Sequence, residues 1–482
     1  MSGPFDKARY EALLEGLEIS EIRLSTIQAA NPTGRIDSEY FRKECLKNIA
    51  NIESYLKGWA ELGSAIVELS GGATPLGANY PDAGVRFLRV QNIMQNFIDD
   101  SDLVFISQKD DEALRRSRLK ENDVLLTITG VSYGKSAVVF ANFAGSNINQ
   151  HSVRMKIRPT MFEPLFVSTF LNSRAGKLQS DQNITGVTRP ALDYSTIRRF
   201  RVPLASRAFQ KVISATVRKG QCQFAEATRQ IQKAEAILAE ALGLGDWQPP
   251  EPLTYTCGSK EVLEAGRFDS QYFAPRVAQL LARLGKDGLT VRDVAPPRIE
   301  KFSPASEGTF RYIEISDLQS NGTAACETID MRDAPSRATW TVRSGDVLTS
   351  TVRPNRRLSA LVTPEQDGCV ASSGFVVLQP QRVAAEVLLT YLRLPVFCEL
   401  MDLHTSASLY PAISDRDLLA LPFPKITPRV SEEIVATVRS AHAVRRLAQV
   451  LLARAQRAVE TAIEEGEAAG MRELNPPATR KR

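Results

Sequence analysis

The strongest constraint on this chain is an eight-residue segment that occurs twice. Residues 34–41 read GRIDSEYF, and residues 266–273 read GRFDSQYF. The second copy begins 232 positions after the first (position 266 against position 34) in a chain of 482 residues. A repeat period close to half the chain length indicates two copies of one large unit and argues against a solenoid of many small repeats. The sequence therefore predicts a tandem duplication.

Further matches extend the duplication over most of the chain. They occur in the same order in both halves, and the offset between them shrinks only from 225 to 221 residues. The matching segments are 86–93 with 311–318, 120–126 with 343–349, 136–139 with 359–362, 189–192 with 410–413, and 202–203 with 423–424. Two copies that fold by the same rules tend to meet across a pseudo-two-fold axis. Such a geometry suits duplex DNA, which is itself nearly two-fold symmetric.

Composition places the chain among ordinary soluble proteins. It is 43% hydrophobic and 24% charged, and it shows neither a signal peptide nor an apolar run of about 18 residues. Six scattered cysteines without a CxxC pair argue against a disulfide framework, and with three distant histidines they argue against a zinc site. We expect a cytoplasmic protein. The formal charge of +5 permits nucleic-acid binding without requiring it.

Each half shows the same order of predicted elements, which indicates a mixed α/β (α+β) fold. A short helix is expected around the repeated motif, followed by a strand-rich region whose β-branched runs are cut by Gly, Pro and Asn turns. Another helix follows, over 165–172 in the first half and 387–393 in the second. A proline-marked exit, at Pro203 or Pro424, then leads into a long helix.

The two long helices carry apolar residues at a 4-3 spacing. In the first helix these are Ile213, Val217, Gly220, Phe224, Ala227, Ile231, Ala234, Leu238 and Ala241. The matching positions of the second are Ile434, Val438, Ala441, Arg445, Ala448, Leu452, Ala455, Val459 and Ala462. Only Arg445 interrupts this seam, and four such heptads predict a long antiparallel two-helix coiled coil. The alternative is a pair of amphipathic helices, each packed on its own domain.

The predicted coiled coil has a length that suits a spacer. A helix over 206–242 would be roughly 55 Å long at about 1.5 Å per residue, and one turn of DNA is about 34 Å. The helices would then hold two recognition regions a fixed distance apart. On this reasoning we expect Leu238→Asp to disturb the spacer and to leave the strand-rich domains folded.

Motifs for catalysis are weak. Residues 130–136 (GVSYGKS) are similar to a phosphate-binding P-loop, but three residues separate the glycines where the P-loop has four, and a strand is predicted to follow. Residues 475–478 (NPPA) are similar to a loop of amino-methyltransferases, but they lack the aromatic residue of that loop. No Ser-His-Asp or Cys-His grouping recurs in both halves. We interpret the chain as a binder, with a P-loop-like NTPase as the alternative of a different class.

Basic, aromatic and amide side chains gather at matching loops of the two halves. The candidate DNA contacts are Tyr133, Lys135, His151 and Arg189 in the first half, and Arg353, Asn355, Arg356, Arg357, His404 and Tyr410 in the second. Arginine pairs bidentately with guanine, asparagine pairs with adenine, and lysine holds phosphate. The alternative is a set of ordinary solvated loops. Because the loops differ while the frame matches, we expect two modules that read different sequences.

With these residues in place, the chain resembles the specificity subunit of type I restriction–modification systems over about residues 15–465. The resemblance rests on 35–41 and its copy, 70–75, 87–93, 123–126, 130–139, 149–151 and the two proline-marked exits. The second half departs from it at one turn, since Arg353 to Arg357 replace the Gly-Lys pair found at 134–135.

The resemblance implies two tandem pseudo-symmetric target recognition domains that are separated by the coiled coil and read a split DNA site. Two methyltransferase subunits, which use S-adenosylmethionine, would dock on the helices. Restriction subunits, which use ATP and Mg, would cut unmodified double-stranded DNA. This chain would hold no cofactor or metal and would not be catalytic. The alternatives are a specificity factor of another phage-defence methylase without a type I nuclease, and a coiled-coil scaffold with no DNA role.

These expectations divide the chain into seven parts. They are an N-terminal helical segment packing near the end of the C-terminal helix (1–33), target recognition domain 1 (34–205), a central spacer helix (206–243), a linker (244–265), target recognition domain 2 (266–426), a C-terminal spacer helix (427–465) and a disordered tail (466–482).

Overall fold

The chain folds into two compact units. The computed structural model describes residues 6–25, 27, 34–77, 80–100, 102–186, 190–249, 251–319, 321–406 and 411–475. Unit 1 comprises residues 1–223 and 446–482, and unit 2 comprises residues 224–445. Two long helices, α9 (Arg207–Ala241) and α16 (Pro428–Glu465), each belong partly to unit 1 and partly to unit 2.

Unit 1 is a mixed α/β body. Its elements are α1 (Lys7–Leu14), α3 (Lys43–Glu53), β1 (Trp59–Glu61), α4 (Leu62–Ala65), β2 (Ile66–Gly71), β3 (Val85–Leu88), η1 (Val90–Asn92), β4 (Ile93–Met94), β5 (Phe97–Ile98), β6 (Val104–Ile106), α5 (Gln108–Ala113), η2 (Arg115–Ser117), β7 (Val124–Thr127), β8 (Ser136–Val138), η3 (Ala141–Phe143), β9 (Asn147–Ile148), β10 (Ser152–Ile157), α6 (Pro164–Asn172), α7 (Arg174–Asn183), α8 (Tyr194–Arg198), β11 (Arg201–Pro203) and α17 (Glu467–Leu474), with parts of α9 and α16. The strands form an antiparallel sheet β2-β10-β7-β8, a sheet β6-β3-β9 in which β3 and β9 are parallel, and the pairs β1-β11 and β4-β5.

The core of unit 1 joins its two larger sheets. Leu88 of β3, Leu125 of β7 and Ile148 of β9 belong to one buried cluster. All four residues of β7 are buried, which explains why its first three, Val124 to Leu126, are apolar in succession and do not alternate with polar residues. The helix α6 packs on β7 and β8, and every residue from Leu165 to Asn172 is buried.

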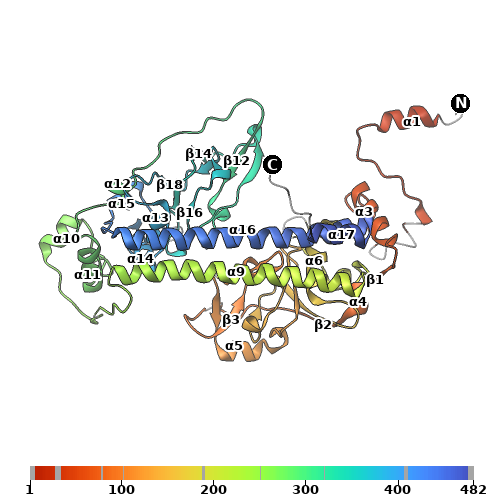
Figure 1. Cartoon of the computed structure of the whole chain (residues 1–482), viewed down its shortest axis with the longest axis horizontal. Helices are drawn as coiled ribbons and strands as arrows, with labels where there is room; N and C mark the ends of the chain where they lie inside the picture. The colour runs from red at the N-terminus through yellow and green to blue at the C-terminus, as the bar shows by residue number, and fades with distance from the viewer. Residues whose placement is uncertain are drawn as a thin grey trace. The chain divides into compact units, whose positions relative to one another are not determined.

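Unit 2 repeats this plan. Its elements are α10 (Ser259–Ala265), α11 (Pro275–Leu284), α12 (Val291–Val294), β12 (Thr309–Ile313), η4 (Ile315–Asp317), β13 (Glu327–Asp330), η5 (Met331–Asp333), β14 (Ala338–Thr341), β15 (Val347–Ser350), η6 (Pro354–Arg356), β16 (Ser359–Leu361), η7 (Pro364–Gln366), β17 (Val370–Ser372), β18 (Phe375–Leu378), α13 (Ala385–Leu392), α14 (Pro395–Leu403), β19 (Thr405–Ser406), β20 (Ala412–Ile413) and α15 (Asp415–Ala420), with the remaining parts of α9 and α16. Figure 1 labels the elements of both units.

The strand pairing confirms the predicted duplication and the mixed fold class. The strand β15 lies between β16 and β18, as β7 lies between β8 and β10. The strand β12 runs parallel to β17, as β3 runs parallel to β9. The helices expected over 165–172 and 387–393 are present as α6 and α13.

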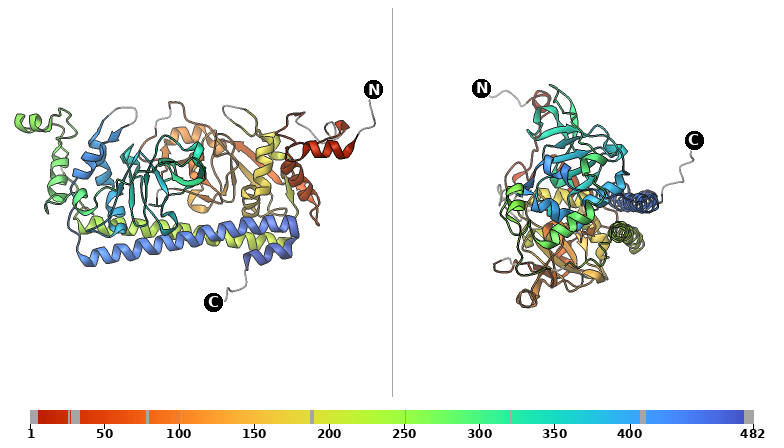
Figure 2. Two further views of the ribbon diagram at one scale, coloured as in Figure 1. Left: turned by 90° about the horizontal axis from the view of Figure 1, so that it is seen from above. Right: turned by 90° about the vertical axis from the view of Figure 1, so that its left-hand side faces the viewer.

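The long helices pair in an antiparallel manner within each unit, as predicted. In unit 2 the later part of α9 and the early part of α16 share one buried cluster, which includes Ile231, Leu238, Ile434 and Val438. In unit 1 the early part of α9 meets the late part of α16, and a Cβ atom added at Gly220 would lie 2.9 Å from Leu452 Cδ2. Ile213, Val217, Phe224 and Val459 are also buried. Figures 1 and 2 draw the two helices side by side in each unit.

The same helices also pack on the strand-rich bodies, so the two alternatives for their packing are not exclusive. The cluster that holds Leu238 and Ile434 also contains Leu388 and Tyr391 of α13 and Phe397 of α14. One face of each helix therefore serves both the helix pair and the core of unit 2.

Arg445 does not interrupt the seam as the sequence suggested. It is buried, with 8% of its surface exposed. Its guanidinium carbon lies 4.9 Å from the centroid of the Phe224 ring, and its Nη2 donates a hydrogen bond to Gln319 Oε1. A cation over an aromatic face, with a polar acceptor at its edge, satisfies a charge at an otherwise apolar position.

The repeated motif forms a turn and not the expected helix. Asp37 Oδ1 accepts the Tyr40 N–H at 3.1 Å, and Arg35 Nε donates to Asp37 Oδ2 at 2.7 Å. In the second copy Arg267 Nε donates to Asp269 Oδ2 at 2.8 Å, and the same aspartate accepts the N–H three residues later. An aspartate that bonds a nearby backbone N–H competes with helix formation. The helices α3 and α11 therefore begin after the motif, at Lys43 and Pro275.

Part of the segment predicted to be a disordered tail is a folded helix. Gly466 has φ 95° and reverses the chain, so that α17 lies against α9 and α16. At Gly470 an added Cβ would meet the Ala458 carbonyl oxygen at 2.5 Å and the Phe209 ring at 3.1 Å. The Glu467 carboxylate accepts the Ser206 N–H at 2.7 Å, next to the start of α9, where a helix N-terminus favours an anion. The prediction is wrong for 467–474, and 476–482 lie outside the described residues.

Two other predicted segments contain regular structure. Residues 259–265 of the predicted linker form α10. Residues 7–14 of the N-terminal segment form α1, and Glu18 Oε1 accepts the Lys43 N–H of α3 at 2.8 Å. The packing of residues 1–33 near the end of the C-terminal helix stays a prediction.

Candidate nucleic-acid interface

In unit 1 the turn between β7 and β8 contains two left-handed glycines. Gly130 has φ 77° and Gly134 has φ 83°, a conformation that glycine adopts without steric cost. The Gly130 N–H donates to the Pro190 carbonyl at 3.2 Å, and Thr129 forms a β-bridge with Ala191. The turn is thereby joined to a second loop.

The matching turn of unit 2 has the same backbone with different residues. Arg353 has φ 51° and Arg357 has φ 59°, and each lies 223 positions after one of the glycines (353 against 130, 357 against 134). The Arg353 N–H donates to the Pro411 carbonyl at 2.8 Å, and Val352 forms a β-bridge with Ala412. A left-handed conformation costs an L-residue roughly 1–2 kcal/mol. The fold thus imposes this turn on both copies.

A short hairpin stands beside each turn. In unit 1 its base is the β-bridge between Thr185 and Ala191, and in unit 2 it is the pair β19-β20. The candidate contacts Arg189 and Tyr410 belong to the segments between these bases and lie outside the described residues. The base of each hairpin nevertheless adjoins the matching turn, which carries Tyr133 and Lys135 in unit 1 and residues 353–357 in unit 2.

Tyr133 and Lys135 are the candidates on the unit 1 turn. The Tyr133 hydroxyl donates to Asp181 Oδ1 at 2.7 Å, and Lys177 Nζ lies 3.6 Å from the ring centroid. Burial, followed by the neighbouring Asp181, raises the pKa of Tyr133 to about 12. Burial lowers the pKa of Lys135. Tyr133 is therefore engaged with α7, and both side chains are only partly exposed.

His151 belongs to the same cluster. Its Nδ1 lies 2.5 Å from the Thr129 hydroxyl oxygen, and its carbonyl accepts the Ile128 N–H at 2.9 Å. The structure thus brings together Tyr133, Lys135 and His151 at the end of β7. A histidine ring has a second nitrogen that can also take part in a hydrogen bond.

The unit 2 turn places its candidates in two different environments. Arg353, Asn355 and Arg356 are exposed, and η6 carries the last two. Arg357 is half-buried, and its Nη2 lies 2.6 Å from the Glu235 carboxylate of α9. The geometry separates three outward side chains from one inward side chain.

His404 is not part of the turn and follows the last residue of α14. Its ring makes an edge contact with Tyr272 of the repeated motif, with centroids 5.4 Å apart and planes at 79°. Burial lowers the pKa of His404, and the nearby Arg267 lowers it further, while Asp417 and Asp269 act in the opposite sense. This histidine packs on the motif, although it adjoins β19 and the hairpin.

Sequence reasoning missed the side chains that support these turns. Lys177 and Asp181 of α7 support Tyr133. Glu235 of α9 and Arg393, which follows α13, support Arg357. Glu235 and Arg393 lie 158 positions apart (393 against 235) in segments that read as ordinary amphipathic helices. Only their burial, with 15% and 5% of the side chains exposed, distinguishes them.

The structure agrees with the sequence argument against a P-loop, because a strand directly follows the glycine turn. Ser136, the last residue of the GVSYGKS segment, is the first residue of β8. A P-loop needs a helix N-terminus at this point to bind phosphate. Within the ranges that the structure describes, no three His, Cys, Asp or Glu side chains form a group that could hold a metal ion.

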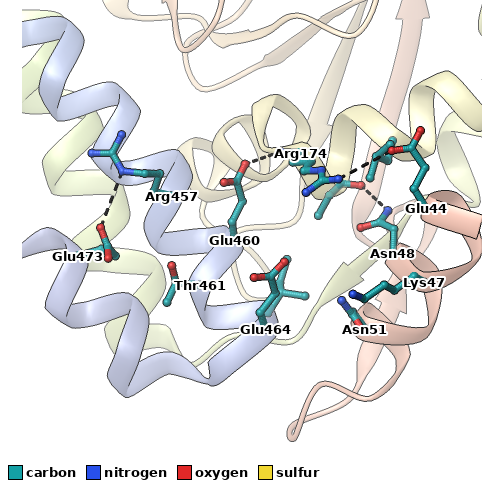
Figure 3. Close-up of a pocket in the computed structure, with 13 residues that line it drawn as sticks. Glu44, Lys47, Asn48, Asn51, Arg174, Arg457, Glu460, Thr461, Glu464 and Glu473 are labelled. Atoms are coloured by element: carbon teal, nitrogen blue, oxygen red, sulfur yellow. Dashed lines mark hydrogen bonds and ion pairs between the residues drawn. The ribbon is translucent and has the colours of Figure 1, made fainter.

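A cavity of about 310 Å³ in unit 1 lies between α3, α7, α16 and α17 (Figure 3). The Arg174 backbone N–H donates to Glu460 Oε1 at 2.6 Å, and the Arg174 guanidinium lies 3.8 Å from Glu44. Arg457 lies 3.8 Å from Glu473. Two of the acidic side chains that line the cavity therefore pair with its two arginines, which is the arrangement of a polar packing interface.

None of the described helices has both the length and the apolar character needed to span a membrane. Comparisons with protein-family models and with curated proteins gave no match.

Three solved structures are similar to the chain at low identity. The HsdS subunit from Thermoanaerobacter tengcongensis is 16% identical, with 85% of this chain and 96% of that chain covered, at a TM-score of 0.29. The type I restriction-modification S subunit from M. genitalium is 12% identical, with 88% and 98% covered, at a TM-score of 0.36. A chain from a study of assembly and conformational transition of the type I R-M system is 16% identical, with 85% and 97% covered, at a TM-score of 0.28.

Proposed function

We propose that this chain is the sequence-specific DNA recognition subunit of a type I restriction–modification complex and that it reads a bipartite target. The observation that carries the proposal is the pair of matching turns. Their backbones agree at Gly130 and Arg353 and at Gly134 and Arg357, while the side chains that they present differ. A constant frame with variable loops is the arrangement expected of two modules that read different sequences.

The chemistry of the turns supports a nucleic-acid ligand. Arg353, Asn355 and Arg356 are exposed on one short turn, and arginine and asparagine are the side chains that pair bidentately with guanine and adenine. In unit 1 Lys135 and His151 occupy the matching region. Phosphate contacts by such residues would dominate the affinity and make it depend on salt concentration.

The sequence resemblance supports the assignment of partners. Two methyltransferase subunits that use S-adenosylmethionine would dock on α9 and α16, and restriction subunits that use ATP and Mg would join them. The 35 residues of α9 give a helix about 52 Å long. We propose that this length fixes the gap between the two half-sites.

The test is a methylome comparison of the host with and without this gene. We expect one adenine-methylation motif, made of two short blocks separated by a fixed gap, to disappear on deletion and to return on complementation. If no bipartite motif depends on the gene, the proposed function is wrong. Retention of methylation without restriction of unmodified DNA would instead identify a specificity factor of a methylase system that lacks the nuclease.

A further inference from the structure

The side chain of Arg357, the last residue of the unit 2 turn, extends to the long helix α9 and contacts it. Its Nη2 lies 2.6 Å from Glu235 Oε1, and its Nε donates to the Arg393 carbonyl at 2.7 Å. Arg393 Nη1 donates in return to the Arg357 carbonyl at 2.9 Å. The backbone at one end of the turn is therefore fixed by two reciprocal hydrogen bonds and one ion pair.

Arg393 and Arg357 share the carboxylate of Glu235. Arg393 Nε lies 3.7 Å from the same Oε1 atom, and only 5% of the Arg393 side chain is exposed. Burial lowers the pKa of Arg393 to about 10, so the guanidinium is still charged at neutral pH. A buried charge requires a partner of opposite sign, and Glu235 supplies it for two arginines.

The backbone of the turn is unfavourable for the residues that occupy it. Arg353 and Arg357 have positive φ, where unit 1 has glycines. An L-residue in this conformation costs roughly 1–2 kcal/mol, and such strain persists where the surroundings determine the conformation. The side-chain contacts of Arg357 are the surroundings that hold this end of the turn.

We propose that Glu235 positions the DNA-contacting turn 353–357 through Arg357 and Arg393. Arg357 is then a positioning residue, and Arg353, Asn355 and Arg356 are the residues that it presents to the duplex. The inference rests on the proposed function and adds a specificity-determining contact between the spacer helix and one recognition turn.

Unit 1 achieves the same turn without this carboxylate. Asn172 occupies the position of Arg393 (172 against 393, an offset of 221). Its Oδ1 accepts the Ser136 N–H at 2.9 Å, and its Nδ2 donates to the Ser136 carbonyl at 2.8 Å. Glycine permits the turn there, and an amide fixes the strand beside it. Loss of Glu235 should therefore affect only the half-site that unit 2 reads.

The test is Glu235→Gln in the full chain, with Glu226→Gln as the matched control on the same helix. Glu226 pairs with Arg229, one turn along α9. Removal of a carboxylate ordinarily strengthens DNA binding, because it removes repulsion of phosphate. We expect the opposite for Glu235→Gln, a weakening of about tenfold, whereas Glu226→Gln should stay within about twofold of the wild type.

The probe is a fluorescent duplex that carries the motif found by methylome comparison, with duplexes altered in one block or the other. Glu235→Gln should lose discrimination at one block and keep it at the other. Arg357→Gly is the second variant, because it restores the residue found at the matching position of unit 1. It should melt close to the wild type and show the same one-sided loss.

The outcomes separate this inference from the proposed function. If the wild-type chain does not prefer the motif to a scrambled duplex, the proposed function fails. If the wild type prefers it and both Glu235→Gln and Arg357→Gly bind as tightly and as selectively, the positioning role is wrong. If Glu235→Gln does not fold, the result for Arg357→Gly decides.

Discussion

At the scale of single residues, the repeated motif keeps the side chains that hold its turn. Arg35 lies over the Tyr40 ring at 5.3 Å, and Arg267 lies over the Tyr272 ring at 4.4 Å. The residue between the arginine and the aspartate differs between the copies: it is Ile36 in the first and Phe268 in the second, and both side chains are exposed. The repeat in the sequence indicated that these residues are important to the fold. It did not indicate the turn, because the turn forms when the aspartate side chain, in place of a helical carbonyl, accepts a backbone N–H.

The contact between His404 and this motif leads to a pH prediction. Burial holds the pKa of His404 below the 6.5 of the unfolded chain, so the unfolded state binds more protons between these two values. Stability should therefore be unaffected by His404 above about pH 6.5 and should fall as the pH drops below it. His404→Phe keeps a ring against Tyr272 but cannot take up a proton. Melting temperatures measured between pH 8 and pH 5 should fall less for this variant than for the wild type. Parallel curves would contradict the prediction.

At the scale of elements, each long helix packs both on the other long helix and on a strand-rich body. The α9 helix packs on α16 and, in unit 2, on α13 and α14 through the same buried cluster. The periodicity indicated a coiled coil, because apolar residues at a 4-3 spacing show that one face of the helix is buried. It could not show which element covers that face, since a partner helix and a domain core require the same apolar residues.

This double packing changes the expectation for Leu238→Asp. Leu238 is fully buried, in a cluster with Leu388 and Phe397, so an aspartate there places an unpaired charge in the core of unit 2. We now expect unit 2 to unfold with the spacer, at a cost of about 4 kcal/mol or more. Gln232→Asp, at an exposed position of the same helix, should change stability by less than about 0.5 kcal/mol. Urea denaturation of both variants is the measurement, and an unchanged midpoint for Leu238→Asp would restore the original expectation.

At the scale of the whole molecule, the compact units do not coincide with the two halves of the sequence. Unit 1 contains the end of α16 and all of α17, although these follow the second copy of the repeat. Each unit therefore takes one part of each long helix. The duplication fixed the frame of both units, while the turns at 128–135 and 351–358 came to differ in charge and in residue type.

This division predicts a one-sided effect of changes in either turn. Arg353→Ala combined with Arg356→Ala should weaken DNA binding. It should also reduce the slope of log affinity against log salt concentration by about one for each phosphate that the variant no longer neutralises. Only one block of the recognised motif should relax. Lys135→Ala, in the matching turn of unit 1, should relax the other block, because a lysine can also pair with the O6 and N7 atoms of guanine. The measurement is the affinity for duplexes altered in one block at a time, and relaxation of both blocks by either variant would contradict the assignment.

The sequence alone determined the duplication, the mixed fold, the two seam helices and the turns that carry the candidate contacts. These features are recorded in local patterns, because periodicity and turn residues follow from the geometry of a few neighbouring residues. The tertiary structure decided that Arg357 faces Glu235, that Arg445 stacks on Phe224, and that residues 467–474 fold back as a helix. Each of these contacts joins segments that are distant in the chain or reverses its direction. Whether such a charge or segment is stabilised depends on the residues that bury it, and no local sequence pattern encodes those residues.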